Sequence, residues 1–175
     1  MKIKYGYVET SNVKATRCGN VFSVKADVPL QNGTLMKLHS NIKGMLHVRE
    51  VKPANDTDKV VLICSVLTDK GAKVDSEMQE VYLRKEAGEI GRAFELVTDD
   101  EFAIHERMIK VTANDKVEVG NYVILDVTTS MYKAVFKANV ATELNKKSFV
   151  AEIISVEPHV DDTLVRLRVI QNKDK

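Results

Sequence analysis

The residues best suited to chemistry form two short polar clusters. Carboxylates and imidazoles bind hard or borderline cations, and two stretches of the chain are rich in them: Asp99, Asp100 and Glu101 with His105 and Glu106, and the run His-Val-Asp-Asp at 159–162. Neither stretch has a known ligand spacing, and side chains in an extended chain alternate between opposite faces. We therefore expect a solvated turn at the first stretch and an exposed hairpin tip at the second, with no metal and no cofactor.

Nucleophilic catalysis requires a Ser, Thr or Cys beside a histidine and an orienting acid. The four histidines stand far apart, at 39, 47, 105 and 159, and the chain has no Gly-x-Ser-x-Gly elbow. Gly88 and Gly91 are too close together for a phosphate-binding loop. These patterns predict a protein that is not an enzyme and has no catalytic residues. A small hydrolase or metal-dependent enzyme with a site around residues 99–106 stays open as an alternative.

A nucleic-acid interface needs basic residues interleaved with aromatic ones. Lysine and arginine exceed the acidic residues by only one charge over 175 residues, so the chain lacks a strong electrostatic footprint. The best basic patch has no interleaved aromatic residues and comprises Lys43, His47, Arg49, Lys52, Arg166 and Arg168. A solvated strand face is the favoured interpretation, and a nucleic-acid-binding β-barrel is a second alternative.

Composition and the N-terminal sequence predict a folded protein that is made in a cytoplasm. Hydrophobic residues are 44% and charged residues 29% of the chain, which argues against disorder. No apolar run approaches the roughly 20 residues that cross a bilayer, and the first residues do not resemble a secretory signal. Cys18 and Cys64 are expected to be reduced thiols, with Cys64 buried in a strand.

Hydrophobic periodicity predicts β-strands along most of the chain. Alternation is typical of half-buried strands, and an unbroken apolar run is typical of a strand buried on both faces. We expect a hairpin or related corner over 21–38, and a strand buried on both faces at 60–67. Further strands are expected at 45–51, 81–85, 92–97, 102–104, 108–111, 121–128, 133–137, 149–154 and 165–169. Only residues 138–147 favour a helix. The fold class is all-β, a short-strand barrel or sandwich with at most one or two short helices.

Two glycine corners mark the architecture. Asn32-Gly33 supplies positive-φ positions for a tight turn, and Gly120 occupies a similar place before an apolar run. Pro29 has no counterpart at Lys116, so we interpret the two as corners with the same backbone geometry rather than as a duplication. We expect an N-terminal arm with an edge strand (1–20), a first β lobe (21–70), a loop or linker (71–80) and a second β lobe (81–175). One combined sheet system is the alternative to two lobes.

Residues 27–38, which contain the Asn32-Gly33 corner and an apolar strand, are followed along the chain by the segments 86–88, 92–94 and 119–123. This layout resembles that of small structural proteins encoded in the head-gene clusters of tailed bacteriophages. The resemblance implies a β-rich, non-enzymatic protein that decorates an assembled capsid shell in the virion, contacting the major capsid protein and associating with itself. Ile3, Tyr5 and Tyr7 alternate in a terminal strand and are the candidate for docking by strand addition. An edge strand paired within its own sheet is the alternative.

Overall fold

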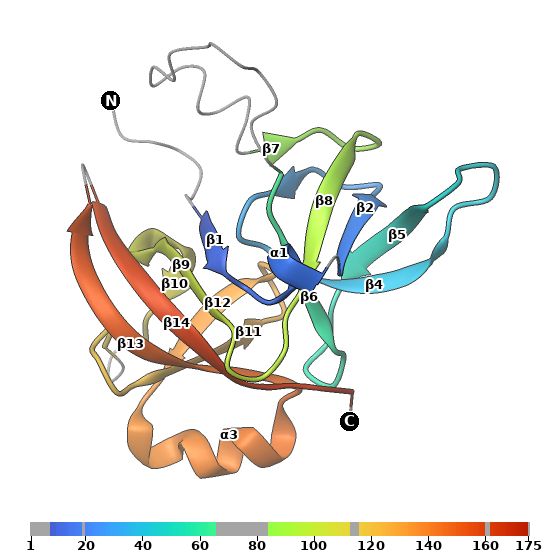
Figure 1. The fold of residues 1–175 in the computed structure, drawn as a ribbon. Coiled ribbons are helices and arrows are strands. Elements are labelled where there is room, and N and C mark those ends of the chain that lie inside the picture. The colour runs from blue at the N-terminus through green and yellow to red at the C-terminus, as the bar shows by residue number, and fades with distance from the viewer. Residues whose placement is uncertain (1–7, 19, 66–83, 113–115, 160–161, 175) are drawn as a thin grey trace.

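The fold consists of a large open sheet packed against a small closed barrel. The computed structural model describes residues 8–18, 20–65, 84–112, 116–159 and 162–174. The large sheet has seven strands in the order β1-β9-β14-β13-β11-β12-β10 (Figure 1). Its strands are β1 (Val8–Asn12), β9 (Glu101–His105), β10 (Ile109–Lys110), β11 (Tyr122–Asp126), β12 (Met131–Val135), β13 (Phe149–His159) and β14 (Asp162–Asn172). The strand-rich architecture confirms the all-β fold class expected from the sequence.

The barrel closes in the order β2-β5-β4-β6-β8. Its strands are β2 (Val21–Lys25), β4 (Leu35–Asn41), β5 (Val48–Pro53), β6 (Val60–Ile63) and β8 (Ile90–Glu95). All neighbours are antiparallel except β2 and β5, which are parallel. A two-stranded ribbon of β3 (Leu30–Gln31) and β7 (Arg84–Lys85) adjoins it in sequence. Because a closed barrel leaves few free edges, these short strands satisfy one another's backbone groups.

The helical elements are short. Those in the described residues are α1 (Ala15–Cys18), α3 (Val140–Lys146) and the 3-10 turns η1 (Glu106–Met108) and η2 (Lys137–Asn139). The expected helix at 138–147 is confirmed by α3, which packs Val140 and Leu144 against one face of the large sheet (Figure 1). Within the described residues, no helix is long and apolar enough to span a bilayer.

Strand β6 shows why its sequence is continuously apolar. All four residues of β6 are buried. Val61 and Ile63 point into the barrel interior, whereas Val60 and Leu62 join the main core between the barrel and the large sheet. The prediction of a strand buried on both faces is confirmed for residues 60–63.

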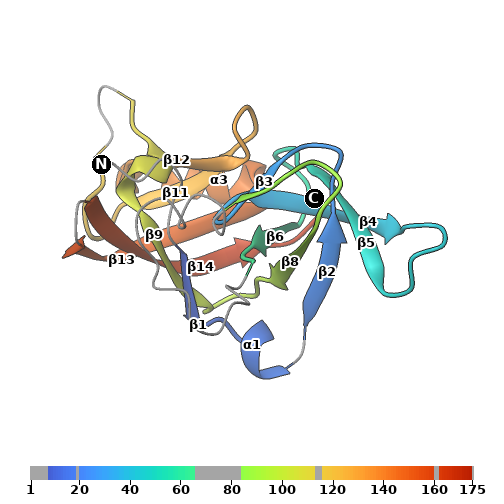
Figure 2. The same ribbon diagram turned by 90° about the horizontal axis from the view of Figure 1, so that it is seen from above.

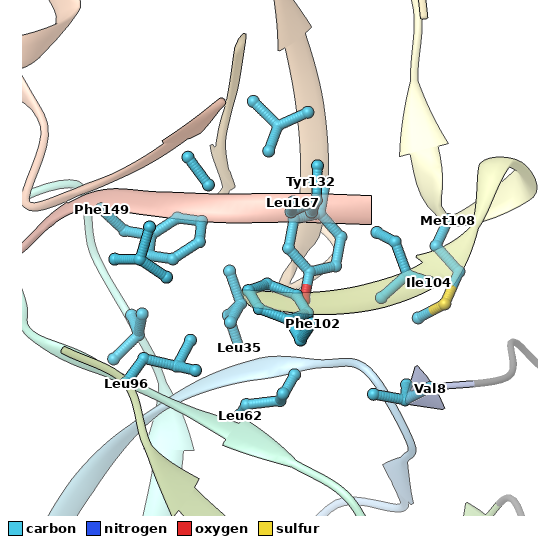
Figure 3. Close-up of a cluster of buried hydrophobic side chains, with 14 of the residues drawn as sticks. Val8, Leu35, Leu62, Leu96, Phe102, Ile104, Met108, Tyr132, Phe149 and Leu167 are labelled. Carbon is cyan, nitrogen blue, oxygen red and sulfur yellow. The ribbon is translucent and has the colours of Figure 1, made fainter. Parts of the chain in front are cut away.

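The main core joins the two sheets. Its aromatic centre consists of Phe102, Tyr132 and Phe149 of the large sheet, and Leu35 and Leu62 of the barrel lie beside it (Figure 3). The Tyr132 ring lies 6.1 Å from that of Phe102 and 6.3 Å from that of Phe149, centroid to centroid. Burial of apolar surface and dispersion contacts in this shared core therefore hold the barrel to the large sheet.

The expected lobe boundaries do not coincide with the division of the strands between the large sheet and the barrel. Strand β1 precedes the barrel strands but pairs with β9 of the large sheet. Strand β8 follows residue 81 yet closes the barrel against β2 and β6. The expected linker at 71–80 lies outside the described residues.

Of the two alternatives expected over 21–38, a hairpin or a related corner, the hairpin is wrong. Strand β2 pairs with β5 and β8, whereas β4 pairs with β5 and β6. The turn at Asn32-Gly33 does exist, closed by the Thr34 N–H donating to Gln31 O at 3.2 Å. It leads from the short strand β3 into β4, so the two longer strands on either side belong to different positions in the barrel.

Of the corner residues, Gly33 and Gly120 have the expected backbone geometry, and Asn32 does not. Gly33 and Gly120 both have φ of 87°, but Asn32 is not in the positive-φ region. Asn32 is buried instead, and its amide accepts from the Ser65 N–H at 2.7 Å and donates to Ser65 O at 3.3 Å. Asn32 therefore ties the corner to the chain leaving β6, because an amide side chain can mimic a strand neighbour.

Candidate functional site

The two polar clusters of the sequence meet at one point of the fold. His105 ends β9, while His159 and Asp162 face each other where β13 ends and β14 begins. Because β14 also pairs with β9, with Leu164 opposite His105, these residues converge at the tip of the β13–β14 ribbon. We call His105, Arg107, His159 and Asp162 the ribbon-tip cluster. It lies at the end of the molecule away from the barrel (Figures 1 and 2).

Polar contacts among the described residues hold the cluster together. His105 Nε2 lies 3.2 Å from His159 Nδ1, and His105 Nδ1 lies 3.5 Å from Asp162 Oδ2. Arg107, from η1, donates its Nε–H to the same Asp162 oxygen. The imidazole of His105 is thus placed between a second imidazole and an anchored carboxylate.

Burial decides the protonation state of His105. The residue is 1% exposed, and this burial lowers its pKa, with the Arg107 and His159 charges acting in the same direction and Asp162 opposing them. Burial alone would raise the pKa of Asp162, but hydrogen bonds from Arg107 and from the Thr163 N–H outweigh it, so the pKa of Asp162 is lowered. At neutral pH the cluster therefore contains a neutral imidazole beside a carboxylate.

The expectation of a solvated turn at residues 99–106 is wrong. These residues form β9 and its flanking turn, and Asp100 and His105 are both buried. Asp100 accepts backbone hydrogen bonds from Lys14 at 2.9 Å and Val97 at 2.8 Å, which gives it a structural role. Asp100 precedes β9 and His105 ends it, so the acidic residues at the start of this strand do not reach the ribbon-tip cluster.

The hairpin tip at 159–162 also differs from expectation, because His159 and Asp162 are half-buried rather than exposed. Residues 160–161 lie outside the described residues. The sequence does indicate that His159 faces Asp162, because the alternating pattern of the last hairpin predicts where the tip of that hairpin lies. No sequence signal pairs this hairpin with β9, which is the pairing that brings in His105.

The expected basic patch is divided between the two sheets. Arg166 and Arg168 belong to β14 and contact Glu9 at 3.4 Å and Glu152 at 2.6 Å. Of the other four residues, Arg49 and Lys52 belong to β5, whereas Lys43 and His47 lie in the loop between β4 and β5. The two β14 arginines are half-buried and held in these ion pairs.

One aromatic residue beside the patch was missed by sequence reasoning. The Arg49 guanidinium lies 5.5 Å from the centroid of the Phe22 ring, and its Nε–H donates to His39 O at 2.8 Å. Both residues line a surface depression of about 270 Å³ together with Lys37 and Lys59. Those lysines already contact Asp58 and Glu95, each at 2.6 Å. The pair could not be found from sequence because β2 and β5 meet only in the closed barrel.

The tip of the β4–β5 hairpin, residues 42–47, projects beyond the barrel body (Figures 1 and 2). Leu46 is 84% exposed and Met45 37% exposed at this tip. Gly44 and His47 have φ of 83° and 63°, and the Ile42 N–H donates to Val48 O at 2.9 Å. A non-glycine residue at positive φ carries strain of about 1–3 kcal/mol, so the surrounding turn holds the apolar side chains in a defined position.

Two other expectations concern single elements. Cys64 is a free, buried thiol as expected, and burial raises its pKa to about 11, so it is a poor nucleophile. The candidate docking strand with Ile3, Tyr5 and Tyr7 lies outside the described residues and stays a prediction.

Comparison with known protein families, with curated proteins and with solved structures finds no match for this chain.

Proposed function

We propose that this chain is a non-enzymatic virion protein that binds the outside of a phage capsid shell and stabilises it through protein–protein contacts. The observation that carries the proposal is the projecting β4–β5 hairpin tip, which presents an almost fully exposed leucine in a constrained turn. The layout of corners around Asn32, Gly33 and Gly120 supports the same role through its resemblance to small phage head proteins.

The hairpin tip has the properties of a docking element. Burying one leucine side chain contributes about 1.5–3 kcal/mol, and a tip held in one conformation loses little entropy on binding. A single contact of this size is weak. On a symmetric shell, repeated copies and contacts between neighbouring copies add avidity, which compensates for weak single contacts.

The partner that fits this tip is the major capsid protein. A specific interface buries roughly 1,200–2,000 Å² in total, more than one hairpin tip provides. The N-terminal strand with Ile3, Tyr5 and Tyr7 is the proposed second contact, by strand addition to the shell. Self-association on the lattice is the proposed third.

The first test is the location of the protein. Mass spectrometry of purified virions is expected to find the chain at a copy number that matches a site of the shell lattice, and its gene is expected among head genes. Absence from virions, or a copy number unrelated to the lattice, would overturn the proposal.

The second test concerns the contact itself. Leu46→Asp is expected to abolish co-sedimentation with capsid shells that lack the protein, because a carboxylate cannot enter an apolar contact without a large desolvation cost. Val119→Asp is the matched control, since Val119 is 65% exposed on a different loop, and it is expected to bind normally. Deletion of residues 2–7 tests the N-terminal strand separately. Normal binding by Leu46→Asp would exclude the hairpin tip.

A nucleic-acid-binding barrel is the second candidate function, and the Phe22–Arg49 pair favours it. An arginine above an aromatic ring is a common platform for stacking bases. The flanking lysines are paired with carboxylates, which reduces the net positive charge of the depression. This function predicts salt-dependent retention of single-stranded DNA or RNA that Phe22→Ala and Arg49→Ala weaken. Absence of binding at low salt would exclude it.

A further inference from the structure

We infer that His105 and His159 form a binding site for one divalent late transition metal ion, such as Zn²⁺, Ni²⁺ or Co²⁺, at the ribbon tip. This inference is independent of the capsid role, because the site lies at the opposite end of the molecule from the β4–β5 hairpin tip (Figures 1 and 2).

The spacing of the two ring nitrogens fits shared ligation. Nε2 of His105 and Nδ1 of His159 are 3.2 Å apart. Two nitrogens that each bind Zn²⁺ at 2.0–2.1 Å with a tetrahedral angle between them are separated by about 3.3 Å. The ring centroids are 5.3 Å apart with 47° between the ring planes, so the rings do not stack and their edges face each other.

Asp162 selects the tautomer that a metal ligand needs. Its carboxylate faces Nδ1 of His105 and therefore favours a proton on that nitrogen, which leaves the lone pair on Nε2, toward His159. A histidine that binds a metal commonly directs its other N–H to a carboxylate, which fixes the ring and raises its basicity. Arg107 donates to the same Asp162 oxygen and anchors it, so the orientation of His105 does not depend on the metal.

The charges around the pair are compatible with a cation. Among the contacts of the described residues around the pair, the Asp162 carboxylate and the Arg107 guanidinium offset each other. Imidazole nitrogens favour zinc, nickel, cobalt and copper over magnesium and calcium.

The protein supplies two ligands in the part of the chain that the structure describes. No group of three His, Cys, Asp or Glu side chains converges among the described residues. Water, or a group from a bound partner, would complete the coordination sphere. The metal would link β9 to β13 across the intervening β14, which would fasten the open end of the ribbon.

The test is a titration of the untagged, full-length protein with ZnCl₂ at pH 7.5, followed by isothermal calorimetry. We expect one equivalent to bind with micromolar affinity. At a 100-fold excess over Kd the melting temperature is expected to rise by about 5–10 °C. On addition of Zn²⁺, the ring ¹⁵N resonances of His105 and His159 are expected to shift, and those of His39 and His47 to stay unchanged.

Variants separate ligation from folding. His159→Gln, at a half-buried position, is expected to abolish the binding, and Asp162→Asn to weaken it by about 10–100-fold. The double variant His39→Gln/His47→Gln, in the exposed histidines of the barrel, is the matched control and is expected to bind normally. Unchanged Zn²⁺ binding by His159→Gln, or no saturable binding to the wild-type protein up to millimolar Zn²⁺, would show that the two rings form only a hydrogen bond.

Discussion

Gly33 and Gly120 have the same backbone geometry but different surroundings. Both have φ of 87°, a conformation that costs an L-residue about 1–2 kcal/mol. A Cβ at Gly120 meets nothing within 4 Å, whereas a Cβ at Gly33 would overlap Met108 Cε and lie 2.9 Å from Val8 Cγ2. A side chain at Gly120 therefore adds backbone strain alone, whereas a side chain at Gly33 adds both backbone strain and steric crowding.

Alanine substitutions at these two glycines test that separation. Gly120→Ala is expected to lower the free energy of unfolding by about 1–2 kcal/mol. Gly33→Ala is expected to lower it by about 1–3 kcal/mol more, because the main core must shift to admit the methyl group. Urea unfolding monitored by circular dichroism measures both. Equal losses would mean that Met108 moves aside without cost.

Tyr132 is a second residue whose environment predicts a measurable effect. It is fully buried among Phe102 and Phe149, and its hydroxyl has no hydrogen-bond partner among the described residues. Burial raises its pKa well above 10. Since a buried polar group without a partner is destabilising, Tyr132→Phe is expected to raise the free energy of unfolding by about 1 kcal/mol. A loss of stability in the same unfolding assay would indicate a bound water or another partner at the hydroxyl.

The buried imidazole of His105 predicts a dependence of stability on pH. Burial lowers its pKa in the folded state below 6.5, so below pH 6.5 the unfolded chain binds this proton more readily than the folded protein. The free energy of unfolding is therefore expected to fall as the pH decreases from 6.5 to the lowered folded pKa. Asp162 acts in a separate window, because its lowered pKa contributes stability that is lost only below about 3.8.

The measurement compares the slope of the unfolding free energy against pH between 7.5 and about 5 for the wild-type protein and for His105→Gln. The variant is expected to show a smaller slope, whatever its absolute stability. Identical slopes would show that His105 takes up a proton in the folded state as readily as in the unfolded chain.

At the scale of elements, the end of β14 connects the two sheets through one side chain. Asn172 accepts from the Val60 N–H at 2.9 Å and donates to Val60 O at 2.8 Å and Leu96 O at 2.9 Å. These bonds join the last residue of β14 to the first residue of β6. They satisfy backbone groups of Val60 and Leu96 at the junction of the two sheets.

Asn172→Ala is expected to lower the free energy of unfolding by about 1–3 kcal/mol, because it leaves the buried Val60 N–H without this partner. Lys173→Ala is the control, since its side chain is exposed next to the same strand end, and it is expected to change stability by less than about 0.5 kcal/mol. Amide hydrogen exchange of Val60 is expected to become faster in the Asn172 variant alone.

At the scale of the whole molecule, the shared core determines how the protein unfolds. The main core contains residues of the barrel and of the large sheet. Because neither sheet covers its inner face without the other, we expect one cooperative unfolding transition.

Leu62→Ala tests this cooperativity. Leu62 is fully buried in the shared core, and its truncation is expected to cost about 2–5 kcal/mol while the transition stays single by circular dichroism and by tyrosine fluorescence. Leu38→Ala, at a partly buried barrel position, is expected to cost less. Two separate transitions, or loss of amide protection confined to the barrel strands, would show that the sheets unfold independently.

Local sequence patterns determined many of the strands and turns of this protein. Alternation predicted β13 and β14 and the strands of the β11–β12 hairpin, and the apolar run at β6 predicted burial on both faces. The positive φ of Gly33 and Gly120 also follows from sequence, because glycine reaches that conformation at low cost. Such features depend on a residue and its close neighbours in the chain.

Only the tertiary structure decided which strands pair over long distances. It closed β2 against β5 and β8 instead of β4, and it placed β14 beside β9, which brought His105 to His159. The physical reason is that strand pairing is fixed by the burial and register of the whole sheet, and many pairings satisfy the same local pattern. The candidate metal site and the Phe22–Arg49 pair are both products of such long-range pairings, so no spacing in the sequence indicates them.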